Sequence, residues 1–148
     1  MPYKTRYVFI AAMDVDPAKE AIFNEVYDKE HIPNLLKVPG VKSVTRLTQQ
    51  PLEMFIGGEK KRIAADGEPR YTAVYEIDSP EVLTSEAWSK AVEAGRWPSE
   101  VRPYTRNRRH VLRKVIVAAR PSADAGPRSP ARQAPARGQR TRSSRGAR

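Results

Sequence analysis

Apolar and polar positions follow two different periods along the chain, and the periods alternate. Strand-like runs with β-branched and aromatic residues occupy four ranges: residues 7–13, 41–47, 71–77 and 110–117. Between the first two runs, Ile22, Phe23, Val26 and Tyr27 recur at helical spacing. Residues 80–92 show a second helical pattern between the last two runs. The pattern predicts β-α-β followed by another β-α-β.

The boundaries of both predicted helices are marked by proline. Asp16-Pro17 and Ser79-Pro80 each place a polar cap before a proline at the first helical position. Because Pro33 lacks an N–H and biases Ile32 out of the helical region, we expect the first helix to end close to His31.

Two stretches lack a clear period. Residues 49–70, which contain Gly57-Gly58, are predicted to be a long polar connection with a short extended piece at Phe55 and Ile56. Residues 97–107 are expected to be irregular. These stretches separate the second strand from the third and the second helix from the last strand.

Two β-α-β copies, over residues 7–47 and 71–117, predict an α+β fold of the ferredoxin-like βαββαβ type with an antiparallel four-stranded sheet. Helices cover only one face of such a sheet, yet the first strand is apolar at both parities. Val8 and Ile10 alternate with Tyr7 and Phe9, so one of the two apolar sets would face away from the helices. A second copy of the sheet is the simplest cover, which predicts a homodimer that closes into a dimeric α/β barrel.

Length and charge divide the chain unequally. The 148 residues suffice for one domain, which we place at residues 1–118. Residues 119–148 hold eight Arg and one Asp, so +7 of the net charge of +10 lies there. With no large apolar residue to bury, this tail is predicted to be disordered. It is either a solvated extension or a weak, non-specific polyanion contact, because it lacks the aromatic residues of specific single-strand binders.

Several function classes find no support. The chain has no Cys, which excludes disulfides, thiolate metal sites and a Cys nucleophile. No run approaches membrane-spanning length, so a cytoplasmic protein is expected. There is no glycine-rich phosphate loop, serine nucleophile motif or dinucleotide fingerprint. The two histidines, His31 and His110, are far apart in sequence, so no metal site is predicted.

His31 is the candidate catalytic residue, because an imidazole titrates near neutral pH. Phe23, Tyr27 and His31 share one helical stripe, which directs the imidazole toward the sheet. Asp28 and Glu30 lie close enough in sequence to orient it. The alternative is a structural histidine that bonds the carbonyl groups freed by the break at Pro33.

Other residues are candidates for contact with a substrate. These are Tyr27, Asp28, Tyr75, Trp97 and His110. A basic cluster can bind an anion through the forked guanidinium geometry, or can be a solvated edge or a salt-bridge partner of a facing subunit. Its members are Arg102, Arg106, Arg108, Arg109, Arg113 and Lys114.

Three segments carry a resemblance to a known family. They are Met13-Asp14-Val15-Asp16-Pro17, Tyr27-Asp28-Lys29-Glu30-His31-Ile32-Pro33-Asn34-Leu35 and Val38-Pro39-Gly40-Val41. These segments resemble the dimeric α/β-barrel superfamily, and most of all its EthD-like branch. The resemblance covers residues 7–117. It implies a pocket between sheet and helices, near the end of the first helix, with His31 facing it.

The resemblance leaves the reaction open. Superfamily members include cofactor-free monooxygenases, lactone isomerases, polyketide cyclases, dehydratases, haem-degrading enzymes and ligand-binding modules. The Asn, Trp and His arrangement of the haem-degrading branch cannot be placed on this chain.

We therefore expect a cofactor-independent enzyme that uses His31 as acid or base on a small aromatic, polyketide-like or other carbonyl compound, with no cofactor. The alternative is a non-catalytic ligand-binding or assembly module. A pocket into which the imidazole faces favours the enzyme, whereas a filled core with His31 bonded only to backbone favours the module.

Overall fold

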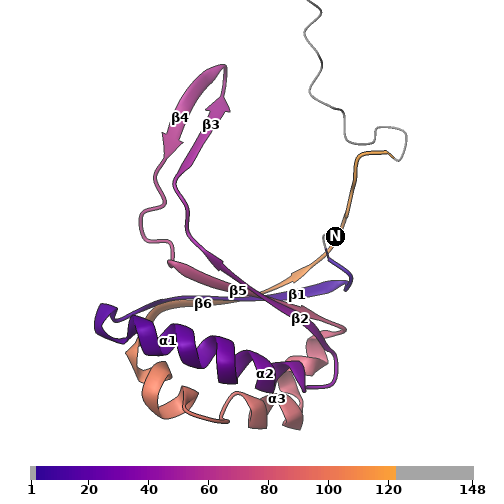
Figure 1. Ribbon diagram of the computed structural model, residues 1–148. Helices are drawn as coiled ribbons and strands as arrows, with labels where there is room; N and C mark the ends of the chain where they lie inside the picture. The colour runs from indigo at the N-terminus through magenta and orange to yellow at the C-terminus, as the bar shows by residue number, and fades with distance from the viewer. Residues whose placement is uncertain (1–2, 123–148) are drawn as a thin grey trace, which may run out of the picture. The chain divides into compact units, whose positions relative to one another are not determined.

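The computed structural model describes residues 3–122, and the chain divides after Ala118 into two units. In the first unit, β1 (Tyr7–Val15), β2 (Val41–Thr48), β5 (Tyr71–Ile77) and β6 (Thr105–Lys114) form an antiparallel sheet in the order β2-β5-β1-β6 (Figure 1). This is the strand order of the ferredoxin-like fold, so the predicted fold class is confirmed. The disorder predicted for residues 119–148 falls mostly on residues outside the described range.

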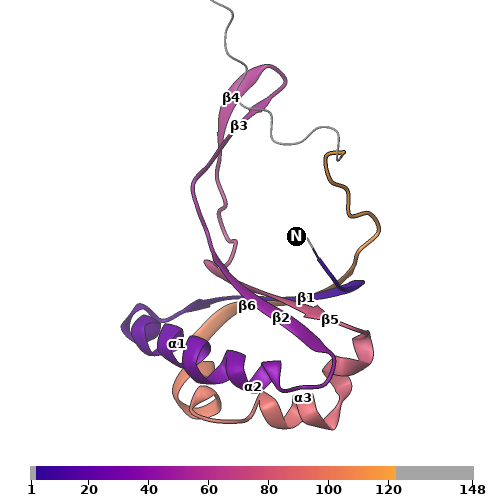
Figure 2. The same cartoon turned by 45° about the vertical axis from the view of Figure 1, so that its right-hand side comes forward.

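The helices lie on one side of this sheet (Figure 2). The first helical run comprises η1 (Pro17–Lys19), α1 (Glu20–Val26), η2 (Tyr27–His31) and α2 (Ile32–Leu36). Its predicted cap is present, since Asp16 Oδ1 accepts a hydrogen bond from the Ala18 N–H at 3.0 Å. Phe23, Val26 and Leu35 are fully buried and belong to one core cluster with side chains of β1 and β5.

The predicted helix end near His31 is wrong. The chain stays helical to Leu36 because the turn Tyr27–His31 is a π-helical turn, in which the Ile32 N–H donates to the Tyr27 carbonyl five residues back. Pro33 then occupies one of the first positions of α2, where a missing N–H costs little. The wider turn accommodates the proline without a break.

The second half also departs from the prediction. After Pro80 the chain forms only the short 3₁₀ turn η3 (Pro80–Thr84), and α3 (Glu86–Ala91) starts from a different cap, since Ser85 Oγ accepts from the Trp88 N–H at 3.1 Å. The stretch expected to be irregular holds η4 (Trp97–Val101), a π-helical turn, and the 3₁₀ turn η5 (Arg102–Tyr104). The last strand begins at Thr105, so His110 lies inside β6 and does not start it.

The predicted polar connection contains a β-hairpin. Strands β3 (Leu52–Ile56) and β4 (Glu59–Ile63) pair antiparallel around Gly57-Gly58, whose φ angles of 61° and 83° give the two left-handed positions of a tight hairpin turn. The hairpin extends from β2 and β5 on the side of the sheet opposite to the helices (Figure 2).

The face of the sheet away from the helices, here called the open face, is partly apolar. Val8 on this face is buried within the chain itself, because Tyr3 and residues 113–117 lie around it. Further along the face, Ile10 and Val74 are half-buried and Val111 is exposed. Among the described residues, no helix has the length and hydropathy needed to cross a membrane.

Candidate functional site

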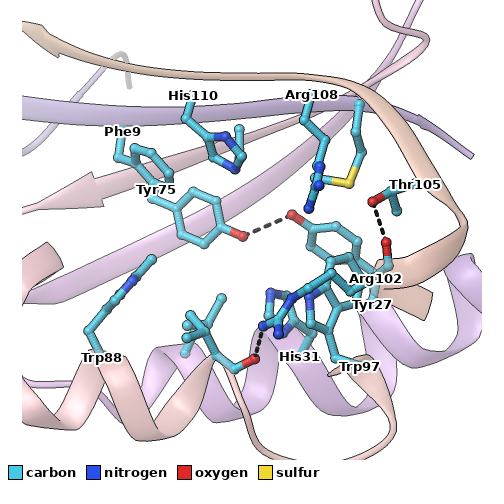
Figure 3. A pocket seen from close by; sticks show the side chains of 14 residues that line it. Phe9, Tyr27, His31, Tyr75, Trp88, Trp97, Arg102, Thr105, Arg108 and His110 are labelled. Carbon is cyan, nitrogen blue, oxygen red and sulfur yellow. Dashed lines mark hydrogen bonds between the residues drawn. The ribbon is translucent and has the colours of Figure 1, made fainter. Parts of the chain in front are cut away.

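A cavity of about 190 Å³ lies between the helix-covered face of the sheet and the helices (Figure 3). Its side chains come from β1, β5 and β6 on one side and from the helical segments on the other. Apolar and aromatic groups predominate, as is usual for pockets that hold small molecules. The lining residues are Phe9, Ala11, Met13, Tyr27, His31, Leu35, Tyr75, Trp88, Val92, Trp97, Arg102, Thr105, Arg108 and His110.

Five of the six residues singled out from the sequence line this one cavity. They are His31, Tyr27, Tyr75, Trp97 and His110. The sixth, Asp28, lies outside the lining, because its largely exposed carboxylate accepts a hydrogen bond from Arg46 Nη1 at 2.7 Å. Asp28 therefore faces the surface of the helix and not the cavity.

His31 is held by two aromatic rings. The side chain is 5 % exposed, and its ring stacks on Trp97 at 4.1 Å with an interplanar angle of 13°. The Tyr27 ring meets the imidazole edge-on at 5.2 Å. These contacts come from η2 and η4, so the two π-helical turns together fix the orientation of the imidazole.

Burial makes this imidazole neutral. Desolvation, with a smaller effect of the Arg102 guanidinium, lowers the pKa of His31 to about 4. Nδ1 is buried and has no hydrogen-bond partner among residues 3–122. The imidazole is not bonded to the helix carbonyl groups, and as a neutral ring it can accept a proton from a bound molecule.

A pair of phenols lines the cavity beside the indole of Trp88, which meets the Tyr75 ring edge-on at 5.8 Å (Figure 3). The hydroxyl groups of Tyr27 and Tyr75 are 2.9 Å apart and hydrogen-bonded. Burial raises the pKa of both, that of Tyr75 well above its usual value, so both stay protonated at neutral pH. One O–H donates within the pair. The other has no partner among residues 3–122 and can donate to a ligand oxygen.

The carboxylate expected to orient His31 has another partner. Glu30 forms an ion pair with Arg96, Oε2 to Nη2 at 2.5 Å, and its Oε1 accepts from the Arg96 N–H at 3.1 Å. Arg96 directly precedes η4, so this pair ties η2 to the segment that carries Trp97. Glu30 therefore positions the indole that stacks on His31 and does not contact the imidazole.

Strand β6 lines the cavity at one edge of the sheet, where His110 and Arg108 are exposed. His110 stacks on Phe9 at 5.9 Å with an interplanar angle of 11°, and burial followed by the charge of Arg108 lowers its pKa. Arg102 already has protein partners, because its guanidinium donates to the Val92 carbonyl at 2.8 Å and to the Glu93 carboxylate at 3.0 Å.

The sequence reasoning did not assign Phe9 or Trp88 to a site. Phe9 belongs to one of the two apolar parities of the first strand, and the sequence did not show which parity faces the helices. Trp88 was missed as well, because its helix begins later than predicted. Among the described residues, no three His, Cys, Asp or Glu side chains cluster closely enough to hold a metal ion.

No protein-family model and no curated protein matches the sequence. Among solved structures, the chain is similar to a MhuD variant with two manganese protoporphyrin IX molecules bound per active site. The two chains are 16 % identical, and the TM-score is 0.52. The match covers 78 % of this chain and 99 % of that chain. MhuD is a haem degrader from Mycobacterium tuberculosis.

Two further solved structures are similar with lower TM-scores. SnoaB, a cofactor-independent oxygenase from Streptomyces nogalater, is 15 % identical, with coverage of 76 % and 94 % and a TM-score of 0.49. An EthD family protein from Bacillus halodurans is 15 % identical, with coverage of 74 % and 99 % and a TM-score of 0.46. At such identities a likeness concerns the fold alone. The resemblance read from the sequence is confirmed at that level.

Proposed function

Starting from the ferredoxin-like α/β-barrel fold, we propose that this protein is a cofactor-independent enzyme that moves a proton within a small aromatic or carbonyl compound. One observation supports the proposal above the others. A neutral, unpartnered imidazole and a protonated phenol pair line the same aromatic cavity. General base and oxyanion donor are the two groups that proton abstraction next to a carbonyl requires.

The roles follow from the protonation states. The C–H bond beside the substrate carbonyl breaks, its proton passes to the neutral imidazole of His31, and its electron pair moves toward the carbonyl oxygen. The enolate oxygen accepts a hydrogen bond from the phenol pair of Tyr27 and Tyr75. When the imidazolium returns the proton to another atom of the same molecule, the product is an isomer, so atoms and electrons balance without a co-reactant.

The cavity volume limits the substrate. A dry cavity of about 150 Å³ is known to hold benzene, so about 190 Å³ fits a single ring with one small substituent. A porphyrin, with four linked pyrrole rings, is far too large for this cavity. The haem chemistry of MhuD is therefore not proposed for this chain.

The alternative is a ligand-binding module of the same fold, and one observation favours it. A general base works best when its pKa is near the working pH, whereas the pKa of His31 is about 4. A binding protein needs no such match. The two functions predict different behaviour of a bound compound, as described below.

We also propose that the protein acts as a homodimer through the open face. Support comes from the apolar side chains that this face presents, among them Ile10, Val74 and Val111. The hairpin β3–β4 adds exposed Leu52 and Met54 on one side, and a two-stranded hairpin alone is marginally stable in water. The cytoplasmic location expected from the sequence stays a prediction.

Proton transfer is tested by isotope exchange. One-ring ketones, phenols and β-dicarbonyl compounds are screened by thermal shift, and those that stabilise the protein are incubated with it in D₂O and followed by NMR. We expect deuterium to replace hydrogen next to the carbonyl. Tyr75→Phe should slow the exchange about 10²-fold, since one oxyanion donor is lost, and His31→Gln should abolish it.

The matched control is Tyr71→Phe. Tyr71 lies on the same strand, but its hydroxyl bonds Glu20 outside the cavity, so exchange should be unchanged. A compound that binds in a His31-dependent manner without any exchange would contradict the enzyme and support the binding module.

A further inference from the structure

Arg108 is the one member of the basic cluster that lines the cavity without a protein partner. Among residues 3–122, its guanidinium makes no hydrogen bond or ion pair, whereas Arg102 is bonded to Glu93 and Val92. Figure 3 shows Arg108 reaching from β6 toward the phenol side of the cavity. None of the cavity-lining residues is acidic. Arg108 therefore brings to the cavity a positive charge that is exposed to solvent and paired with none of the described protein groups.

The register of β1 and β6 directs Arg108 there. Phe9 pairs with Leu112 and Ala11 with His110, so Arg108, two residues before His110, faces the cavity by regular alternation. Ala12 pairs with Arg109 but Asp14 pairs with Arg106, so two residues of β6 lie opposite the single residue between them on β1. This β-bulge directly precedes Arg108 and brings Thr105 to the cavity side as well.

Asn107 makes the bulge possible. Its φ of 51° is the only positive φ of a non-glycine residue among residues 3–122, and Asn tolerates this conformation better than most residues. Its side chain donates to Asp14 Oδ2 and to the Gly67 carbonyl, each at 3.0 Å. The bulge is thus held on the open face, directly before Arg108. Bulges that re-aim a side chain are common beside functional sites.

We propose that Arg108 is a specificity residue that selects substrates with one anionic oxygen group on a single ring, as in an aromatic carboxylate. The inference rests on the proposed function, because it concerns the same cavity. A guanidinium pairs with a carboxylate through two parallel hydrogen bonds. The ring then lies among the aromatic side chains, with the imidazole of His31 and the phenol pair within the same cavity.

An anionic ligand also changes His31. A negative charge in the cavity favours the protonated imidazole, so it raises the pKa of His31 from about 4 toward neutrality. The base strength therefore improves when the matching substrate is bound. This coupling reconciles a strongly depressed pKa in the free protein with a role as base.

The test uses benzoate and its neutral isostere benzamide. Both tryptophans of the chain, Trp88 and Trp97, line the cavity, so intrinsic fluorescence reports binding directly. With the full-length protein, we expect benzoate to bind at least 10-fold more tightly than benzamide at low salt, and the difference to shrink as salt is added. Arg108→Gln should remove the preference, and Arg108→Lys should keep part of it.

Arg109→Gln is the matched control. It removes the same charge from the neighbouring position, whose side chain faces away from the cavity toward the Gly67 carbonyl, so the preference for benzoate should persist. Equal binding of benzoate and benzamide would overturn the inference, as would a preference that survives Arg108→Gln or is lost in Arg109→Gln. The proposed enzyme would stand in that case if neutral carbonyl compounds still exchange deuterium through His31.

Discussion

His31 makes stability depend on pH at the scale of a single residue. Its pKa is about 4 in the folded protein and near 6.5 in an unfolded chain. Between these values the unfolded state binds the additional proton, so the folded state loses stability as the pH falls from about 6.5 to about 4, by up to about 3 kcal/mol. Below about 4 both states are protonated and His31 has no further effect.

This dependence is measured by urea unfolding at pH 4.5 and pH 7. Carboxylates with lowered pKa values, such as Asp14, also weaken the fold in acid, so the relevant quantity is the difference from a His31→Gln variant. The variant should lose less stability between the two pH values than the wild type. Equal losses would show that His31 is solvated in the folded protein.

Some single residues were predictable from spacing and others were not. Tyr27 and His31 lie four positions apart, which placed both on the sheet side of the helix, and the structure has them on that side. The role of Glu30 was missed, because its partner Arg96 is far away in sequence. Arg108 was not separated from the five other basic residues of its cluster, although it lies two residues before the candidate His110 on the last strand and so shares its face.

At the scale of elements, the bulge in β6 carries a prediction of its own. Asn107→Val places a β-branched residue at a positive φ and removes the bonds to Asp14 and Gly67, so it should destabilise the protein by about 1–3 kcal/mol. It should also weaken benzoate binding, but less than Arg108→Gln does, because Arg108 keeps the register of the strand that follows the bulge. Asn107→Gly keeps the backbone conformation and should retain most of the benzoate affinity.

Urea unfolding and fluorescence titration of the two variants check this prediction. If the Asn107→Val protein folds and binds benzoate with unchanged affinity, the bulge does not affect how Arg108 contacts the ligand.

The order of strands and helices could be predicted because the two halves repeat one pattern of strand, polar cap, proline and helix. The hairpin β3–β4 was missed because β4 is rich in charged residues, although Gly57-Gly58 is a typical hairpin turn. The helix end at Pro33 was wrong for a different reason. A π-helical turn depends on which carbonyl the Ile32 N–H selects, and residue periodicity does not encode that choice.

At the scale of the whole molecule, the open face predicts self-association. Ile10→Lys places a charge at the centre of this face, opposite Val74 and Val111 of the flanking strands, and should shift the protein from dimer to monomer. Light scattering at micromolar concentration measures the mass. Leu36→Lys is the control, because Leu36 is equally apolar and 46 % exposed but lies in the helical layer.

A wild-type protein that is monomeric under these conditions would contradict the homodimer, as would an Ile10→Lys variant of unchanged mass. The unequal distribution of charge bears on the same experiment. Residues 1–118 carry a net charge of only +3, so repulsion between two copies of the sheet domain is small.

The π-helical turn between α1 and α2 has a consequence for how this chain can vary in length. Such a turn contains one residue more than regular winding needs. Deleting a residue between Tyr27 and His31 would turn the five-residue hydrogen bond into the four-residue bond of a regular α-helix, and would leave the later side chains close to their present directions. Leu35, 1 % exposed, would stay in the core. Related chains should therefore tolerate the loss of one residue in this turn, and an ungapped alignment with such a shorter relative would match His31 to the wrong neighbour.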